Sequence, residues 1–299
     1  MGSNLPLTIF TPAYNRAHTL RKLFESLSIQ KNKDFEWVIV DDGSVDETQS
    51  LVDEFVAINS IQIHYFKVSN GGKHRAINKG VVAAKGDLFM IIDSDDYLWN
   101  DNVVSSILSK KEFLDKNNQF CALVGNRVTP EGKVIGTQIG YNILDSDFID
   151  YRVNKKVIGD RAEVIKTSVM KEFPFPELEG ENFITEGVVW NRMALKYKAR
   201  YINEAYIACE YLPGGLTDSS FKLCDNNPNG VELMYSEASK LPDLPFLIRL
   251  KFAFYFWYLS YYSTNSFFTR LKKIGLKYIW LFPFACFVRY FKEKKNNDK

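Results

Sequence analysis

Three carboxylates follow an apolar run within four positions of the chain, at Asp93, Asp95 and Asp96. Asp93 and Asp95 are two residues apart, so on an extended backbone they point to the same side of the strand. Paired carboxylate oxygens are ligands that Mg²⁺ and Mn²⁺ prefer. The pattern therefore predicts a Mn²⁺ or Mg²⁺ site held by Asp95 and Asp93. The alternative is an acidic turn in which Asp95 or Asp96 caps the next helix.

Two further polar clusters also follow apolar runs. Residues 11–16 come after the run 5–11, and residues 41–46 come after the run 35–40. In open parallel sheets, ligands bind at the carboxyl ends of the strands. We therefore expect these two clusters and residues 93–96 to form one site.

The elements that must position this site alternate along the first hundred residues. Apolar runs at 5–11, 35–40, 61–68 and 88–92 are separated by helical spacing at 17–29, after residue 46, and at 76–84. This alternation predicts an α/β fold with a mainly parallel central sheet and helices on both faces. The pattern loosens from 120 to 240, where a helix is expected at 186–196 and a hinge at the turn cluster 225–230.

Charge and cysteine usage narrow the function classes. Residues 241–299 carry eleven basic and three acidic side chains, whereas residues 1–240 carry 27 basic and 33 acidic ones. The four cysteines show neither a disulfide framework nor a zinc-binding spacing, which fits a reducing compartment. The N-terminus lacks a signal-peptide pattern, so a cytoplasmic location is expected. No nucleic-acid-binding module is recognisable, and we expect no nucleic-acid partner.

The tail is rich in aromatic residues. Residues 246–291 hold 18 of the 44 aromatic residues, and the charge-free segment 252–269 is at the lower length limit for a spanning helix. Basic residues between aromatic runs are typical of helices that lie in a membrane interface. We expect residues 246–291 to contact a membrane surface. The alternative is a helical hairpin that closes the core or makes a homo-oligomer.

Taken together, four ordered segments resemble glycosyltransferase family 2, a family of GT-A-fold enzymes that use nucleotide sugars. The segments are Thr11-Pro12-Ala13-Tyr14-Asn15-Arg16, Asp41-Asp42-Gly43-Ser44-Val45-Asp46, residues 70–80 and Asp93-Ser94-Asp95-Asp96. Residues 70–80 are similar to the family's N-x-G-x-x-x-A-x-N-x-G segment, and the resemblance covers roughly residues 5–215. No GxGxxG follows the first strand, so NAD binding is not expected.

The resemblance implies a donor site. Asp41 or Asp42 would accept a hydrogen bond from the nucleobase, and Tyr14 and Pro12 would pack against that base. Lys73 would contact a phosphate of the donor. Ile77 stands where the family often has Arg, and Arg75 would compensate. The alternatives are helix caps for residues 41–46 and a solvated helix face for the two basic residues. The full expected donor-binding set is Thr11, Pro12, Tyr14, Arg16, Asp41, Asp42, Lys73, Arg75, Asp93 and Ser94.

A sugar hydroxyl is a poor nucleophile until a general base removes its proton. The family pattern of an acidic pair followed six residues later by Arg is similar to Thr185-Glu186 and Arg192, which places Glu186 at the base position. Glu181 is a nearby rival, and either acid could instead cap a helix. Trp190 would stack on a sugar or belong to the core. Residues 211–217 resemble a late loop that folds over the donor.

The resemblance implies a metal-dependent, inverting glycosyltransferase. It would move a sugar from a nucleoside diphosphate, UDP above all, to a glycan or lipid-linked acceptor in surface polysaccharide biosynthesis at the cytoplasmic face of the membrane. The expected domains are residues 1–240, with a nucleotide-sugar half at 1–125 and an acceptor half at 126–240, and a helical tail at 241–299. The alternatives are a sugar nucleotidylyltransferase and a non-catalytic glycan-binding scaffold.

Overall fold

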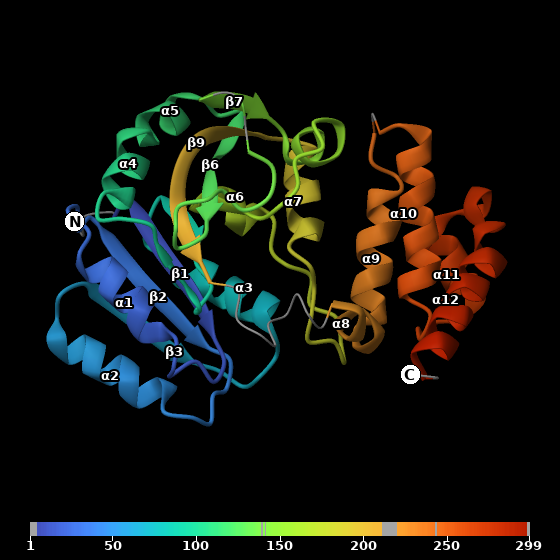
Figure 1. Cartoon of the computed structure of the whole chain (residues 1–299), viewed down its shortest axis with the longest axis horizontal. Coiled ribbons are helices and arrows are strands. Elements are labelled where there is room, and N and C mark those ends of the chain that lie inside the picture. Colours follow the sequence, from blue (N-terminus) through green and yellow to red (C-terminus); the bar gives the residue numbers. More distant parts are fainter. Residues whose placement is uncertain (1–4, 139, 141, 211–219, 243, 298–299) are drawn as a thin grey trace. The chain divides into compact units, whose positions relative to one another are not determined.

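The computed structural model describes residues 5–138, 140, 142–210, 220–242 and 244–297 (Figure 1). The chain divides into two compact units, one formed by residues 1–175 and 192–211 and the other by residues 176–191 and 212–299. This division concerns compactness alone. The functional division into residues 1–240 and 241–299 stays a prediction.

The first unit holds the strands and most of the shorter helices. Its strands are β1 (Leu7–Ala13), β2 (Phe35–Asp41), β3 (Gln62–Lys67), β4 (Leu88–Ile91), β5 (Asp96–Leu98), β6 (Phe120–Val128), β7 (Ile143–Ser146), β8 (Arg161–Lys166) and β9 (Lys198–Cys209). Its helices are α1 (Leu20–Ser28), α2 (Thr48–Ile58), α3 (Lys73–Ala83), α4 (Val103–Ser109), α5 (Lys111–Lys116), the π-helical turn η1 (Asp150–Asn154) and α6 (Thr167–Glu172). Helix α7 (Gly187–Ala194), expected at 186–196, runs across the boundary between the units.

These strands form one sheet in the order β3-β2-β1-β4-β8-β6-β9-β5, and β7 pairs with β9. The neighbours within β3-β2-β1-β4 are parallel, and so is the pair β6–β9. The pairs β4–β8, β6–β8, β5–β9 and β7–β9 are antiparallel. The expected α/β class is confirmed, and the continuous parallel part lies where strands and helices alternate strictly. The second half lacks the regular crossovers that parallel neighbours need, and most of its pairs are antiparallel.

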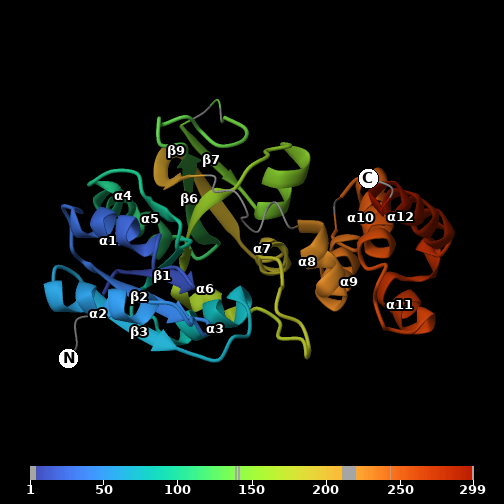
Figure 2. The ribbon, with the colours of Figure 1, turned by 60° about the horizontal axis from the view of Figure 1, so that its bottom comes forward.

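Helices cover both faces of the sheet, as expected (Figure 2). On one face Phe24 of α1 and Phe55 of α2 stack with Trp37 of β2. On the other face α3 packs against β1 and β2. A Cβ atom at Gly80 would lie 2.2 Å from the Phe10 ring, so only glycine lets α3 come this close to β1.

The second unit is helical. It contains α8 (Ser220–Asn226), α9 (Pro228–Ala238), α10 (Phe246–Leu259), α11 (Phe267–Ile274), the 3₁₀ turn η2 (Leu276–Tyr278) and α12 (Leu281–Asn297). Residues 225–230, the expected hinge, form the junction of α8 and α9. Phe256, Trp257, Tyr278 and Ala285 belong to one buried cluster that joins α10, η2 and α12. Among the described residues, no helix is long and apolar enough to cross a membrane.

Candidate active site

The three polar clusters meet at one edge of the sheet, as the sequence predicts. Ala13 pairs with Asp41 where β1 and β2 end, and the N–H of Asp42 donates to the Ala13 carbonyl at 2.8 Å. The N–H of Ile92, just after β4, donates to the Phe10 carbonyl of β1 at 2.9 Å. Neighbouring parallel strands therefore place residues 11–16, 41–46 and 93–96 side by side.

Asp41 and Asp42 are buried and hold the surrounding loops. Asp41 accepts hydrogen bonds from the Ser44 N–H at 2.7 Å and from the Tyr65 hydroxyl. Asp42 accepts from the N–H groups of Gly71 and Gly72, both at 2.8 Å. Asp42 thus fixes the loop that leads into α3 to the end of β2. The predicted nucleobase contact of these two acids stays a prediction, and their observed role is to shape the loop.

The turn after β1 is tied to the turn after β2 by reciprocal hydrogen bonds. The Asn15 N–H donates to Ser44 Oγ at 2.8 Å, and the Val45 N–H donates to Asn15 Oδ1 at 2.9 Å. Asn15 has φ = 54°, a left-handed conformation that Asn tolerates better than most residues. Asp46 accepts from the Thr48 N–H and from the Ala17 N–H, both at 3.1 Å, so its observed role is to hold the turn before α2, whose N-cap residue is Glu47.

The acids after β4 lie in a tight turn and not on extended backbone. The N–H of Asp96 donates to the Asp93 carbonyl at 3.0 Å, and β4 itself ends at Ile91. The expectation that Asp93 and Asp95 lie on extended backbone, pointing to the same side of a strand, is therefore wrong. The cap alternative is also wrong, because Asp96 begins strand β5 and the next helix, α4, starts only at Val103.

Two basic side chains balance the negative charge of this turn. Lys73 Nζ lies 2.6 Å from Asp93 Oδ1, and Arg127 Nη1 lies 3.7 Å from Asp93 Oδ2 and 2.6 Å from Asp96 Oδ2. Burial by itself would raise the pKa of Asp93, but Lys73 and Arg127 lower this pKa to about 2. Burial raises the pKa of Asp96 to about 6 in spite of Arg127. Asp93 is therefore ionised throughout the physiological pH range.

Arg127 was not predicted from the sequence. It lies on β6, and its Nε donates to the Arg161 carbonyl at 3.0 Å, which aims the guanidinium at the turn. Burial disfavours its charge, but Asp93 and Asp96 raise the pKa of Arg127, so it stays a cation. A signal did exist in the sequence, because an arginine inside the apolar run 120–128 needs a buried anionic partner.

Asp95 is the acid of this turn that remains available to bind a metal ion. Within the described part of the chain, its partly exposed carboxylate makes no hydrogen bond or ion pair. No group of three or more potential metal ligands occurs among the described residues. Mg²⁺ is commonly bound through one or two carboxylates together with substrate phosphates, and Asp95 with Asp93 fits that kind of site.

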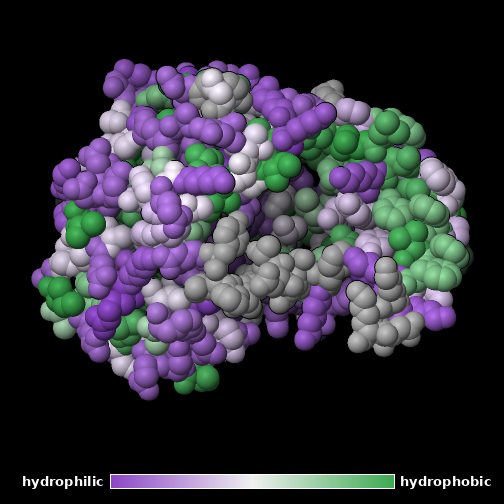
Figure 3. All heavy atoms as spheres, viewed as in Figure 1, coloured by the Kyte–Doolittle hydropathy of each residue, from purple (hydrophilic) through white to green (hydrophobic). Residues whose placement is uncertain are grey.

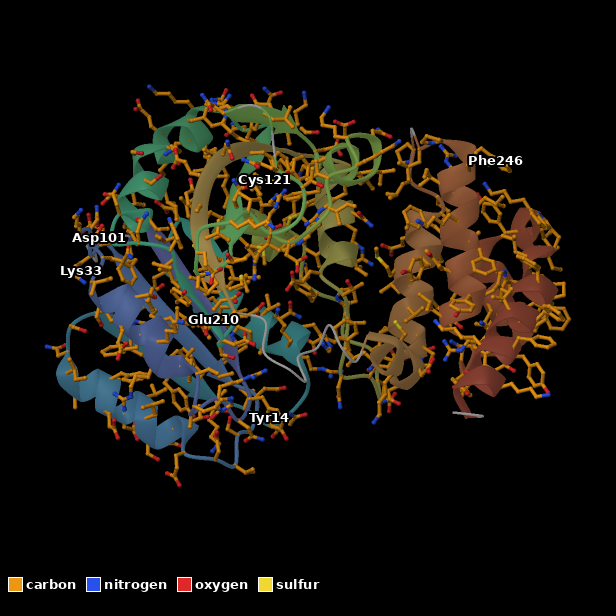
Figure 4. All side chains as sticks on the ribbon, in the orientation of Figure 1. Tyr14, Lys33, Asp101, Cys121, Glu210 and Phe246 are labelled. Carbon is orange, nitrogen blue, oxygen red and sulfur yellow. The ribbon has the colours of Figure 1, made fainter. Side chains whose placement is uncertain are left out.

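The other predicted donor-site residues differ in how accessible they are. Tyr14 is 49% exposed at the end of β1 (Figure 4), so its ring can serve as a stacking surface. Pro12 and Arg16 are partly exposed, and Arg16 contributes to lowering the pKa of Asp93. Thr11 is buried, and its hydroxyl accepts from Trp37 Nε1 at 3.0 Å. Two further residues complete the set: Ser94 is buried in the turn, and Arg75 donates to the Gly71 carbonyl.

Both candidate bases belong to the second unit. Glu186 is partly exposed immediately before α7, and its carbonyl accepts from Val189 and Trp190 in the first turn. Glu181 is buried and accepts from the N–H groups of Asn229 at 2.5 Å and Gly230 at 2.6 Å, where α9 begins. Glu181 thus supports the start of α9, and Glu186 is the more accessible acid. The loop predicted at residues 211–217 lies outside the described residues.

Solved structures share this fold. S. aureus TarS residues 1–349 in complex with UDP-GlcNAc is 19% identical, with a TM-score of 0.64 over 94% of this chain and 79% of that one. The mannosyltransferase PcManGT from Pyrobaculum calidifontis, in complex with GDP-Man and Mn²⁺, is 15% identical, with a TM-score of 0.54 over 93% of this chain and 72% of that one. At these identities the similarity shows the fold, which is of the GT-A type.

The family follows from the sequence match. A family model described as Glycosyl transferase family 2 matches residues 8–159, just over half of the chain. The chain belongs to glycosyl transferase family 2, so the expected family and enzyme class are confirmed. The alternatives of a nucleotidylyltransferase and of a non-catalytic scaffold are not retained.

Named relatives show the range of activities in this family. The chain is 36% identical over 140 residues to the chondroitin synthase of Pasteurella multocida, covering 46% of this chain and 14% of that protein. It is 27% identical over 209 residues to the Campylobacter jejuni GalNAc(5)-diNAcBac-PP-undecaprenol beta-1,3-glucosyltransferase, covering 67% of this chain and 63% of that protein. The chain thus spans only a small part of the first relative and somewhat less than two thirds of the second.

Proposed function

We propose that this protein transfers a sugar from a UDP-sugar, with inversion at the anomeric carbon and with a divalent metal, to a glycan or lipid-linked acceptor. The proposal places this reaction in surface polysaccharide biosynthesis at the cytoplasmic face of the membrane. The observation that carries it is the charge arrangement after β4, where Lys73 and Arg127 surround Asp93 while Asp95 stays available.

A nucleoside diphosphate needs positive charge at its phosphates and a surface for its base. Lys73, at the first position of α3, is placed to donate to a phosphate oxygen, and the N-terminus of the helix favours an anion there. The exposed Tyr14 ring offers the base a face. Asp42 accepts hydrogen bonds from Gly71 and Gly72 and so holds the loop that leads to Lys73. This chain's own residues thus bind and orient the donor.

Asp95 and Asp93 would hold Mn²⁺ or Mg²⁺, which when bound supplies positive charge that stabilises the departing diphosphate. Glu186 would take the proton of the attacking hydroxyl. Direct displacement needs no covalent intermediate, and we assign no nucleophilic side chain.

The identity of the donor and acceptor rests on the neighbours. UDP is favoured because TarS, the neighbour with the higher TM-score of the two described above, holds UDP-GlcNAc. A lipid-linked acceptor is favoured because the Campylobacter jejuni relative is named for an undecaprenol-linked substrate. An enzyme with such an acceptor works at a membrane surface, which agrees with the predicted membrane contact of residues 246–291.

Nucleotide release from a panel of UDP-, GDP- and dTDP-sugars, with Mn²⁺ or with EDTA, tests the proposal. We expect metal-dependent release of UDP from a UDP-sugar. The rate of this release should fall about 100-fold or more in Asp95→Asn, while the melting temperature stays unchanged. Asp34→Asn, an exposed acid before β2, is the matched control. Full activity of Asp95→Asn, or activity unaffected by EDTA, would overturn the metal assignment.

A further inference from the structure

Helix α12 presents aromatic rings to solvent. Phe284, Phe287 and Phe291 are 58%, 60% and 52% exposed, and Tyr290 beside them is 55% exposed. Positions i, i+3 and i+7 lie on one side of a helix, so the three phenylalanines form a stripe. Trp280, just before the helix, is 57% exposed. We call these five residues the aromatic face, and the hydrophobic surface of the bundle is visible in Figure 3.

Most of the aromatic face lies outside the core of the bundle, although the Phe284 ring lies 5.8 Å from the Phe254 ring of α10. The opposite side of α12 carries Leu281, Ala285 and Arg289, which are all buried. Arg289 donates to Asp225 of α8, which fastens α12 to the unit, and to Glu293 within α12 itself. Large exposed apolar patches on a folded protein mark interaction sites.

Exposed charges next to the aromatic face are basic. Lys277 in η2 and Lys294 in α12, three positions after Phe291, are exposed. Lys292 is also exposed, but its Nζ lies 5.9 Å from the Tyr258 ring of α10, on the side of α12 that faces the bundle. The acid within this stretch, Glu293, is paired with Arg289 at 2.7 Å. Aromatic rings flanked by lysines match a bilayer surface that is apolar below its head groups and negatively charged at them.

We propose that the aromatic face of α12 docks this protein on an anionic lipid bilayer. The rings enter the head-group region, the lysines contact lipid phosphates, and α12 lies parallel to the membrane plane. A second copy of the chain fits this face less well, because a two-fold contact would bring the lysines of one copy against those of the other. This proposal identifies the surface through which the protein would contact the membrane. It rests on the proposed function only in the assumption that the enzyme acts at a membrane.

Vesicle binding by the full chain, without donor or acceptor, tests the proposal. We expect co-sedimentation with vesicles of phosphatidylcholine and phosphatidylglycerol, and weaker binding at high salt and with phosphatidylcholine alone. Replacing Phe284, Phe287 and Phe291 by Gln should weaken binding roughly ten-fold per ring. Replacing Lys277 and Lys294 by Gln should weaken binding about five-fold per lysine, and only with the anionic vesicles.

Matched controls distinguish binding through the aromatic face from non-specific hydrophobic binding. Val56→Gln with Ile58→Gln removes two exposed aliphatic residues of α2 and should leave binding unchanged. Brominated lipid should quench the fluorescence of the wild type more than that of Trp280→Phe. Binding that survives the triple Phe variant would overturn the proposal, and so would a dimer that this variant dissociates without any vesicle binding. Because no sugar transfer is measured, such a failure leaves the proposed chemistry untouched.

Removing residues 241–299 is a poorer test. Tyr235 of α9 packs against Phe252 and Tyr255 of α10, so this truncation exposes apolar surface that the full chain buries. The resulting protein would bind vesicles and itself for that reason alone.

Discussion

Lys73 Nζ lies 2.6 Å from Asp93 Oδ1 and joins the first residue of α3 to the turn after β4. The two residues are 20 positions apart, and each was predicted for the donor site on separate grounds. Their contact balances the charge of the turn and leaves Asp95 as the carboxylate that accepts no partner among the described residues.

Lys73→Met should raise the KM for the donor about 10- to 100-fold, because a charge-assisted hydrogen bond contributes about 1.5–3 kcal/mol. Titration of UDP in the presence of Mn²⁺ would measure the same loss as a weaker Kd. Lys79→Met is the control, since Lys79 is exposed on the same helix. Equal losses in the two variants would show that general positive charge, and not the Lys73 position, binds the donor.

Glu186→Gln and Glu181→Ala should fail in different ways. Glu186→Gln should lower kcat by about 100-fold or more without changing the melting temperature, because a general base contributes that much. Glu181→Ala should lower the free energy of unfolding by about 1–2 kcal/mol, since it removes the acceptor for two N–H groups at the start of α9. The folded fraction of Glu181→Ala should keep most of its kcat. Glu25→Gln, an exposed acid of α1, is the control, and the reverse outcome would make Glu181 the base.

Asp46 should stabilise the fold in a pH-dependent way. Its slight burial raises the pKa, but hydrogen bonds from Thr48 and Ala17 outweigh this and lower the pKa below the ordinary value. A lowered carboxyl pKa adds stability above the unfolded pKa of about 3.9, and this stability is lost as the pH falls through the folded pKa. Urea unfolding should therefore show Asp46→Ala less stable by about 1 kcal/mol at neutral pH, with a smaller difference in acid. Asp34→Ala should show neither effect.

Glu232 is completely buried in the second unit and contacts two cations. Its Oε1 lies 2.9 Å from Arg270 Nε, and its Oε2 lies 2.6 Å from Lys273 Nζ. Glu232→Gln should cost about 3–5 kcal/mol, because Arg270 is then left buried without its counter-charge. The double variant Glu232→Leu with Arg270→Met should recover most of that loss in thermal unfolding. A double variant as unstable as the single one would show that packing, and not charge, sets the cost.

The sequence determined the local elements and the polar clusters. Apolar runs and helical spacing predicted β1 to β4 and α1 to α3 near their observed bounds, because side-chain periodicity is a local property. The motifs at residues 11–16, 41–46 and 93–96 were identified from residue types and order, and parallel pairing then placed them at one edge.

The tertiary structure decided which partner each charge finds. Arg127 comes from a strand 31 residues after Asp96, and sheet order, which no local pattern fixes, brings the two within 2.6 Å. In the same way, Glu181 contacts the start of α9 across 48 residues. The sequence shows where each carboxylate stands, but its function depends on whether folding leaves it partly exposed and unpaired among the described residues, as with Asp95, or surrounds it with hydrogen-bond donors, as with Asp41 and Asp42.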